Sequence, residues 1–95
     1  MHARVVRFTG VTEETVEKVV RQVDESDGPP PGVNATAMKL IYDSDQGTGV
    51  FIAFFDSAED AKAADEVMGA MDPGDTPGSR ASVDIGEVVI ERSVG

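Results

Sequence analysis

The sequence predicts an α+β domain with the element order βαββαβ. Four runs rich in β-branched and aromatic residues suit strands, at 3–9, 36–43, 48–55 and 82–93. Two segments with helical spacing of apolar residues separate them, and glycine or proline stands near most boundaries. The chain of 95 residues suits one domain. We therefore expect a single domain over 1–95, with a four-stranded antiparallel sheet and two helices in the ferredoxin-like arrangement.

The first strand is expected to end at Gly10, and a helix should follow it. Thr12 suits the N-cap, since its hydroxyl can accept a hydrogen bond from a free backbone N–H. Val11 and Val16 stand at the positions of a hydrophobic staple. The helix should end near Glu25 and present one apolar stripe, made of Val16, Val19, Val20 and Val23.

The second half of the chain begins with a hairpin. Residues 43–47 carry turn chemistry between the two middle strands. Ser57 then suits the N-cap of a helix over 58–71, with Asp60 in a variant of the capping box. The residues expected to face inward on this helix are Ala61, Ala64, Val67, Met68 and Met71. The segments 27–32 and 72–78 contain proline and glycine and are expected to be connectors.

The third strand predicts a second copy of the chain. Alternate residues of a strand point to opposite faces, which here gives Val50, Ile52 and Phe54 on one face and Phe51, Ala53 and Phe55 on the other. Both sets are apolar, whereas two helices cover only one face. Burial of each large apolar side chain contributes ~1.5–3 kcal/mol of stabilising free energy, which a side chain left exposed does not contribute. We therefore expect a homodimer, with Phe51, Phe55, Ile52 and Phe54 in the sheet core or the dimer interface.

The whole chain resembles the dimeric α/β-barrel superfamily, in its antibiotic-biosynthesis-monooxygenase-like (ABM-like) branch. The resembling segments are 31–33, Asp43 and Gly47 of the hairpin, 55–61 and 87–90. The resemblance implies a barrel of two sheets packed face to face. It also implies a pocket between each sheet and its helices, lined with polar residues such as asparagine, tryptophan and histidine. Relatives include cofactor-independent monooxygenases and haem-degrading enzymes. This chain has no tryptophan and one histidine, at position 2, which argues against histidine-ligated haem.

Composition narrows the classes of partner. The formal charge is −10, which disfavours binding to nucleic acid. Cysteine is absent, so the sequence offers no disulfide, thiolate metal site or thiol nucleophile. No apolar run approaches the ~20 residues that span a bilayer, and the N-terminus does not resemble a signal peptide. We expect a cytoplasmic protein without a cofactor or metal.

Two arginines of the first strand are candidates for a buried charge. Arg4 and Arg7 point to opposite faces, so one of them faces inward. The inward arginine could bind an anion or pair with an acid such as Asp84 or Glu87, and pairing is the favoured alternative.

Three further residues are candidate ligand contacts. His2 could act as a base or ligand, although a residue beside the first methionine is commonly frayed. Tyr42 lies near a strand end, where its hydroxyl could reach a pocket, with core packing as the alternative. Asn34 precedes the second strand and could orient a substrate.

No motif in the sequence specifies catalysis. The leading hypothesis is therefore a homodimer that binds a small apolar or aromatic molecule. The first alternative is a cofactor-independent monooxygenase or isomerase acting on an aromatic polyketide-like compound, which rests on the resemblance. The second is a structural or regulatory module that binds another protein through its acidic surface.

Overall fold

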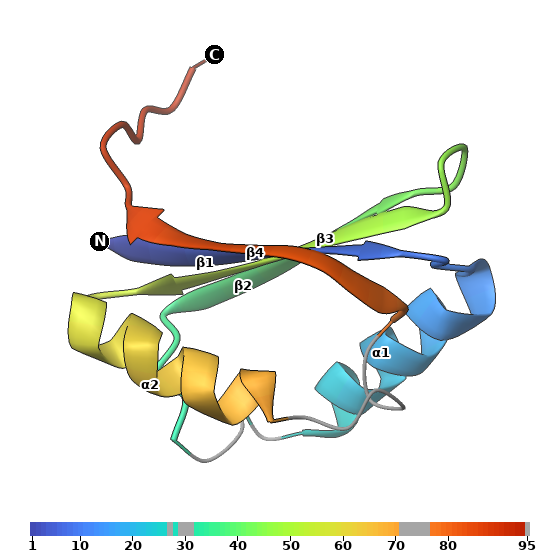
Figure 1. Ribbon diagram of the computed structural model, residues 1–95, viewed down its shortest axis with the longest axis horizontal. Helices are drawn as coiled ribbons and strands as arrows, with labels where there is room; N and C mark the ends of the chain where they lie inside the picture. Colours follow the sequence, from blue (N-terminus) through green and yellow to red (C-terminus); the bar gives the residue numbers. More distant parts are fainter. Residues whose placement is uncertain (27, 29–31, 71–76, 95) are drawn as a thin grey trace.

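The computed structural model describes residues 1–26, 28, 32–70 and 77–94. Six elements follow one another in the predicted order βαββαβ. They are β1 (His2–Thr9), α1 (Glu13–Glu25), β2 (Ala37–Asp43), β3 (Thr48–Phe55), α2 (Ala58–Gly69) and β4 (Ser79–Glu87). Figure 1 shows the four strands in one twisted layer and both helices on the same side of it. The ferredoxin-like prediction is confirmed.

The sheet has the strand order β2-β3-β1-β4, and every neighbouring pair is antiparallel. Val6 of the central strand β1 lies opposite Phe51 of β3 and Val83 of β4. Residues paired in this way share a face of the sheet. Arg4, Val6 and Phe8 therefore point toward the helices, and all three are buried.

Each helix begins at the predicted cap. The Thr12 hydroxyl accepts a hydrogen bond from the backbone N–H of Thr15, whose own hydroxyl accepts from the backbone N–H of Thr12. In α2 the Ser57 hydroxyl accepts from the backbone N–H of Asp60 at 3.2 Å. The predicted inward residue Met71 and most of the two expected connectors lie outside the described residues.

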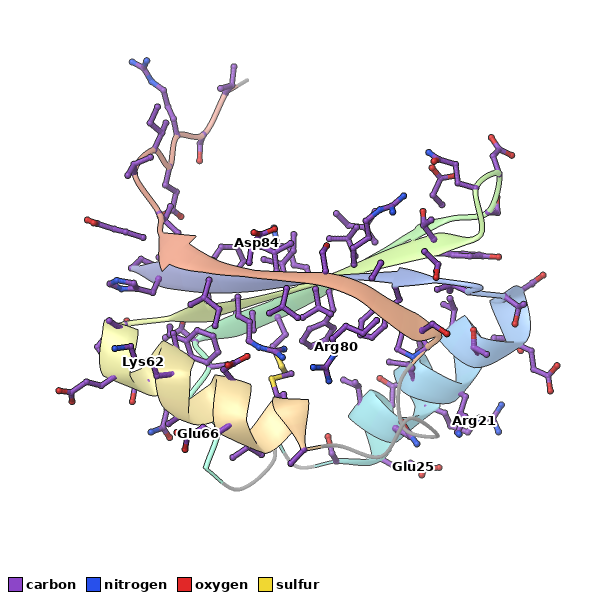
Figure 2. All side chains as sticks on the ribbon, viewed as in Figure 1. Arg21, Glu25, Lys62, Glu66, Arg80 and Asp84 are labelled. Carbon is purple, nitrogen blue, oxygen red and sulfur yellow. The ribbon has the colours of Figure 1, made fainter. Side chains whose placement is uncertain are left out.

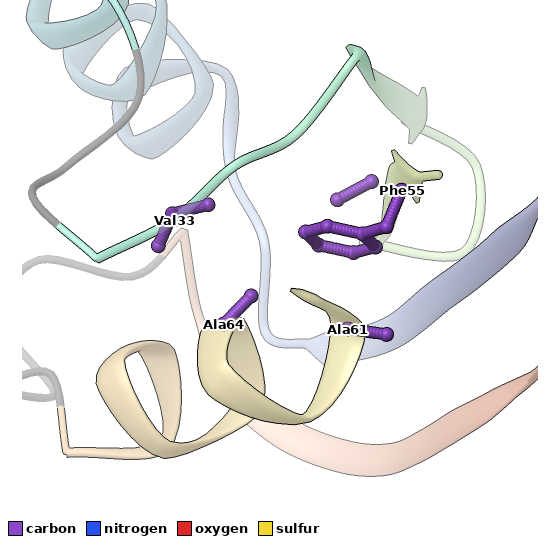
Figure 3. Packing of buried hydrophobic residues seen from close by; sticks show 5 residues of the cluster. Val33, Phe55, Ala61 and Ala64 are labelled. Atoms are coloured by element: carbon purple, nitrogen blue, oxygen red, sulfur yellow. The ribbon is translucent and has the colours of Figure 1, made fainter. Parts of the chain in front are cut away.

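The two helices pack on the sheet very differently. Ala61 and Ala64 of α2 are fully buried against Phe55, because an alanine face allows the helix to approach closely (Figure 3). By contrast, α1 has no buried residue. Val20 and Val23 of its expected apolar stripe are 49% and 50% exposed. The prediction of one continuous core-facing stripe on α1 is therefore only partly correct.

The last strand differs from its prediction at both ends. It runs from Ser79 to Glu87, and not over 82–93. Pairing with β1 continues to His2 opposite Glu87, and the N–H of Val88 makes one more backbone bond to the carbonyl of Met1. Beyond that point none of the described strands supplies partners, and the apolar run that predicted a longer strand is exposed at Val89, Ile90 and Val94.

The alternation predicted for β3 is confirmed. Ala53 and Phe55 are fully buried on the side of the helices, whereas Val50, Ile52 and Phe54 remain partly exposed on the other side. We call this second side the open face. No helix covers it in Figure 1, and the segment after β4 rises on the same side. None of the helices in the described part of the chain is long and apolar enough to cross a membrane.

Candidate functional site

A cavity of about 330 Å³ lies between the helix-facing side of the sheet and the two helices. Most of its wall is apolar. Its described lining residues are Arg4, Val6, Phe8, Val19, Gln22, Val23, Ser26, Gly28, Met38, Phe51, Met68, Pro77 and Arg80.

The cavity follows from the unequal packing of the helices. On the α2 side, small alanines bring the helix down onto Phe55 and leave little space. On the α1 side, Val19 and Val23 face the sheet without being buried in it. Phe8 and Phe51 form part of the opposite wall, because strand alternation places both on the helix-facing side. The space between these valines and aromatic rings is the apolar part of the site.

Arg4 is the buried cation of this site, with only 2% of its side chain exposed. Its Nε donates a hydrogen bond to Oδ1 of Asp65 on α2 at 2.9 Å. Its Nη1 lies 3.7 Å from the sulfur of Met68, which is a weak acceptor. None of the described residues accepts a hydrogen bond from Nη2. A guanidinium carries five N–H donors, so Arg4 keeps donor capacity beside the cavity.

Arg80 is a second cation in the cavity wall, and sequence reasoning missed it. It lies on β4 opposite Phe8, and its Nη2 donates to the carbonyl oxygen of Met68 at 3.5 Å. Figure 2 shows its side chain entering the space between sheet and helices. The predicted strand began at residue 82 and the expected connector ended at residue 78, so Arg80 was assigned to neither. Even a predicted strand that began at residue 79 would not have shown which face Arg80 occupies. The β1–β4 register shifts at this point, so simple alternation of faces does not hold there.

The ion pair of Arg4 differs from the predicted ones. Asp84 lies opposite Val5 and therefore belongs to the open face. Glu87 shares the helix-facing side, but it stands opposite His2 at the end of the ladder. The acid that meets Arg4 is Asp65, which comes from a helix rather than from the neighbouring strand.

The other three candidates do not line the cavity. The ring of Tyr42 is partly buried and packs against the cluster of Val6, Phe8 and Val11. Asn34 is exposed, and its side-chain amide donates to Oδ1 of Asp60 at 3.4 Å. His2 is held in β1 by backbone pairing, and its Nδ1 is buried with no hydrogen-bond partner among the described residues.

The chemistry available in the described wall is recognition rather than proton transfer. Its polar side chains are two arginines, Gln22 and Ser26. Arginine stays protonated and acts only as a donor, so neither guanidinium can serve as a base. Donors beside an apolar wall suit a ligand with an apolar body and an acceptor group.

Comparisons with known proteins place the fold. No protein-family model matches the chain, and no curated protein matches it. A solved structure from Chloroflexus aurantiacus J-10-fl, provisionally assigned as an antibiotic biosynthesis monooxygenase, aligns over 99% of this chain and 98% of its own, with a TM-score of 0.60. The chain has an ABM-like fold. The sequence identity is 11%, so the likeness concerns the fold and not the chemistry.

Within this ABM-like fold, the cavity lies where the resemblance implied a pocket, between the sheet and its helices. Its polar groups are not the expected ones. The resemblance pointed to asparagine, tryptophan and histidine, whereas the described wall carries arginines from β1 and β4.

Proposed function

We propose that this chain is a small-molecule-binding protein whose ligand occupies the cavity between the sheet and the helices. The observation that carries the proposal is the cavity itself, with about 330 Å³ of space and a mostly apolar wall. Known sites for small molecules measure roughly 300–1,000 Å³ and combine an apolar lining with a few polar groups. A ligand with a compact aromatic or short aliphatic body fits this size.

We further propose that the protein is a homodimer joined through the open face. Partly exposed apolar side chains cover the centre of that face, including Val50, Ile52 and Phe54. The same face carries exposed charges of both signs, Arg7 on β1 and Asp84 on β4. A face with both signs can pair with its own copy about a two-fold axis, whereas a face of one sign would repel itself.

A cofactor-independent monooxygenase acting on an aromatic polyketide-like compound is the second candidate function. The provisional assignment of the Chloroflexus aurantiacus structure favours it. An oxygenase would consume dissolved oxygen when supplied with an electron-rich aromatic substrate, whereas a binding protein would return the compound unchanged. Oxygen-electrode traces with a small panel of polyphenols and anthrones separate the two.

The binding proposal is tested with N-phenyl-1-naphthylamine, a neutral dye whose fluorescence rises in apolar sites. We expect saturable binding of one dye per chain. The dimer is tested by light scattering, which should give twice the chain mass at micromolar concentration. Absence of saturable dye binding would overturn the binding site, and a monomeric mass at these concentrations would overturn the dimer.

A further inference from the structure

We propose that the ligand of this cavity is an apolar monocarboxylate whose carboxylate is bound by Arg4 and Arg80. The inference rests on the proposed binding function and adds the chemical class of the ligand. It begins from the two guanidinium groups in a mostly apolar wall.

Arg4 can bind a ligand group in addition to its ion pair with Asp65. Asp65 occupies its Nε edge, which holds the plane of the guanidinium in place. The other edge, formed by Nη1 and Nη2, has only the sulfur of Met68 as a described partner. Two parallel N–H groups match the two oxygens of a carboxylate, and such paired bonds are among the stronger ones in proteins. A ligand carboxylate would replace a weak sulfur contact with charge-assisted hydrogen bonds.

Arg80 contacts the same residue, Met68, from another strand. Both guanidinium groups contact Met68, Arg4 at the sulfur and Arg80 at the backbone carbonyl. The described lining holds no carboxylate, although the whole chain carries a formal charge of −10. The charged side chains of the described wall are therefore both cationic, in a protein that is acidic as a whole. Arg4 is buried and Arg80 is exposed, and positive charge beside a cavity favours an anionic ligand.

The charge balance points to a monoanion. Asp65 compensates Arg4 at 2.9 Å, which leaves Arg80 as the positive charge without a carboxylate in the described wall. Among the described residues of the wall, one negative charge on the ligand balances Arg80, whereas a phosphate dianion would exceed it. Most of the remaining described wall, including Phe8, Phe51 and Val19, is apolar and suits an apolar ligand body.

The test compares decanoate with decan-1-ol as competitors of N-phenyl-1-naphthylamine at pH 7.5. The two share one aliphatic chain and differ in the charged head group. The quantity of interest is the preference, defined as the ratio of the dissociation constant of decanol to that of decanoate. Comparing this ratio between variants cancels the intrinsic hydrophobicity of the two compounds. We expect Arg4→Met to lower the preference about tenfold, or ~1.4 kcal/mol, and Arg80→Gln to lower it at least about threefold.

Arg21→Gln is the matched control. It removes the same charge from the outer side of α1, where Figure 2 shows the side chain pointing away from the cavity, and it should leave the preference unchanged. Circular dichroism checks that each variant is folded. If Arg4→Met is not folded, the preference measured for Arg80→Gln alone tests the carboxylate assignment. An unchanged preference in the folded arginine variants would overturn the carboxylate assignment while dye binding persists. If the unmodified protein does not bind the dye at all, the proposed binding function itself is overturned.

Discussion

Arg4 of β1 and Asp65 of α2 form an ion pair between a fully buried and a half-exposed side chain. Their Nε and Oδ1 atoms lie 2.9 Å apart, with exposed fractions of 2% for the arginine and 43% for the aspartate. The aspartate can be hydrated if it loses its partner. The arginine is much less accessible to water, because only 2% of its side chain is exposed. The two halves of the pair therefore contribute unequally to stability.

Removing the acid should destabilise the protein more than removing the base. Asp65→Ala leaves a buried guanidinium without a carboxylate, which costs about 1–3 kcal/mol of unfolding free energy. Arg4→Met replaces the buried charge with an apolar chain of similar length and should cost no more than about 1 kcal/mol. Urea denaturation of both variants, with Arg21→Met as the surface control, checks the order. A greater loss in Arg4→Met would contradict this account of the pair.

Neighbouring phenylalanines of β3 should respond in opposite ways to an introduced charge. Phe55 is fully buried against α2, so Phe55→Asp should cost about 4 kcal/mol or more and prevent stable folding. Phe54 lies on the open face, so Phe54→Asp should leave the subunit folded and halve the mass measured by light scattering. Circular dichroism provides the folding check. A folded and dimeric Phe54→Asp protein would show that the copies do not meet through the open face.

Filling the cavity should block dye binding without a large effect on stability. Val23 and Val20 lie one turn apart on α1 and are equally exposed, but only Val23 lines the cavity. Val23→Phe should weaken binding of N-phenyl-1-naphthylamine at least about tenfold, because the ring takes up the space of the dye. Val20→Phe should not weaken it. Both should change the unfolding free energy by no more than about 0.5 kcal/mol. Equal effects of the two variants would place the dye elsewhere.

Two glycines near β4 should also differ in their tolerance of a methyl group. A Cβ added at Gly78 would overlap the carbonyl oxygen of Thr9, so Gly78→Ala should cost about 1–3 kcal/mol. Nothing lies near the corresponding position of Gly86, and its backbone suits any residue. Gly86→Ala should therefore be neutral or stabilise by up to about 1 kcal/mol. Thermal unfolding compares the two variants. A Gly78→Ala protein as stable as the unmodified one would mean that the backbone around Thr9 and Gly78 can shift at little cost.

Local signals in the sequence predicted most of the fold. Thr12 and Ser57 begin their helices as expected, because a cap depends on residues within one turn. The bounds of β3 were correct, since its apolar run lies between turn residues on one side and a cap on the other. The end of β4 could not be predicted in this way. It depends on where β1 begins, which no residue between Glu87 and Ser93 encodes.

The site was harder to predict than the fold because its contacts join distant segments. Arg4 was a candidate, but its partner Asp65 lies 61 residues away on a helix. To choose among the acids of the chain, one needs the register of the strand pairs and the position of α2. A slip of one residue in that register would move every side chain of a strand to the opposite face of the sheet. Periodicity on α1 likewise predicts which side is apolar, but not how far that side stands from the sheet. The cavity comes from this distance.

Because side chains of β3 alternate between the two faces of the sheet, this one strand contributes both to the cavity and to the open face. Phe51 belongs to the cavity, whereas its neighbours Val50 and Ile52 belong to the opposite surface. Odd and even positions therefore have different surroundings. If the proposed ligand site and dimer interface hold, a substitution at Phe51 should alter the ligand site while the outer surface keeps its shape, although both surfaces come from eight consecutive residues.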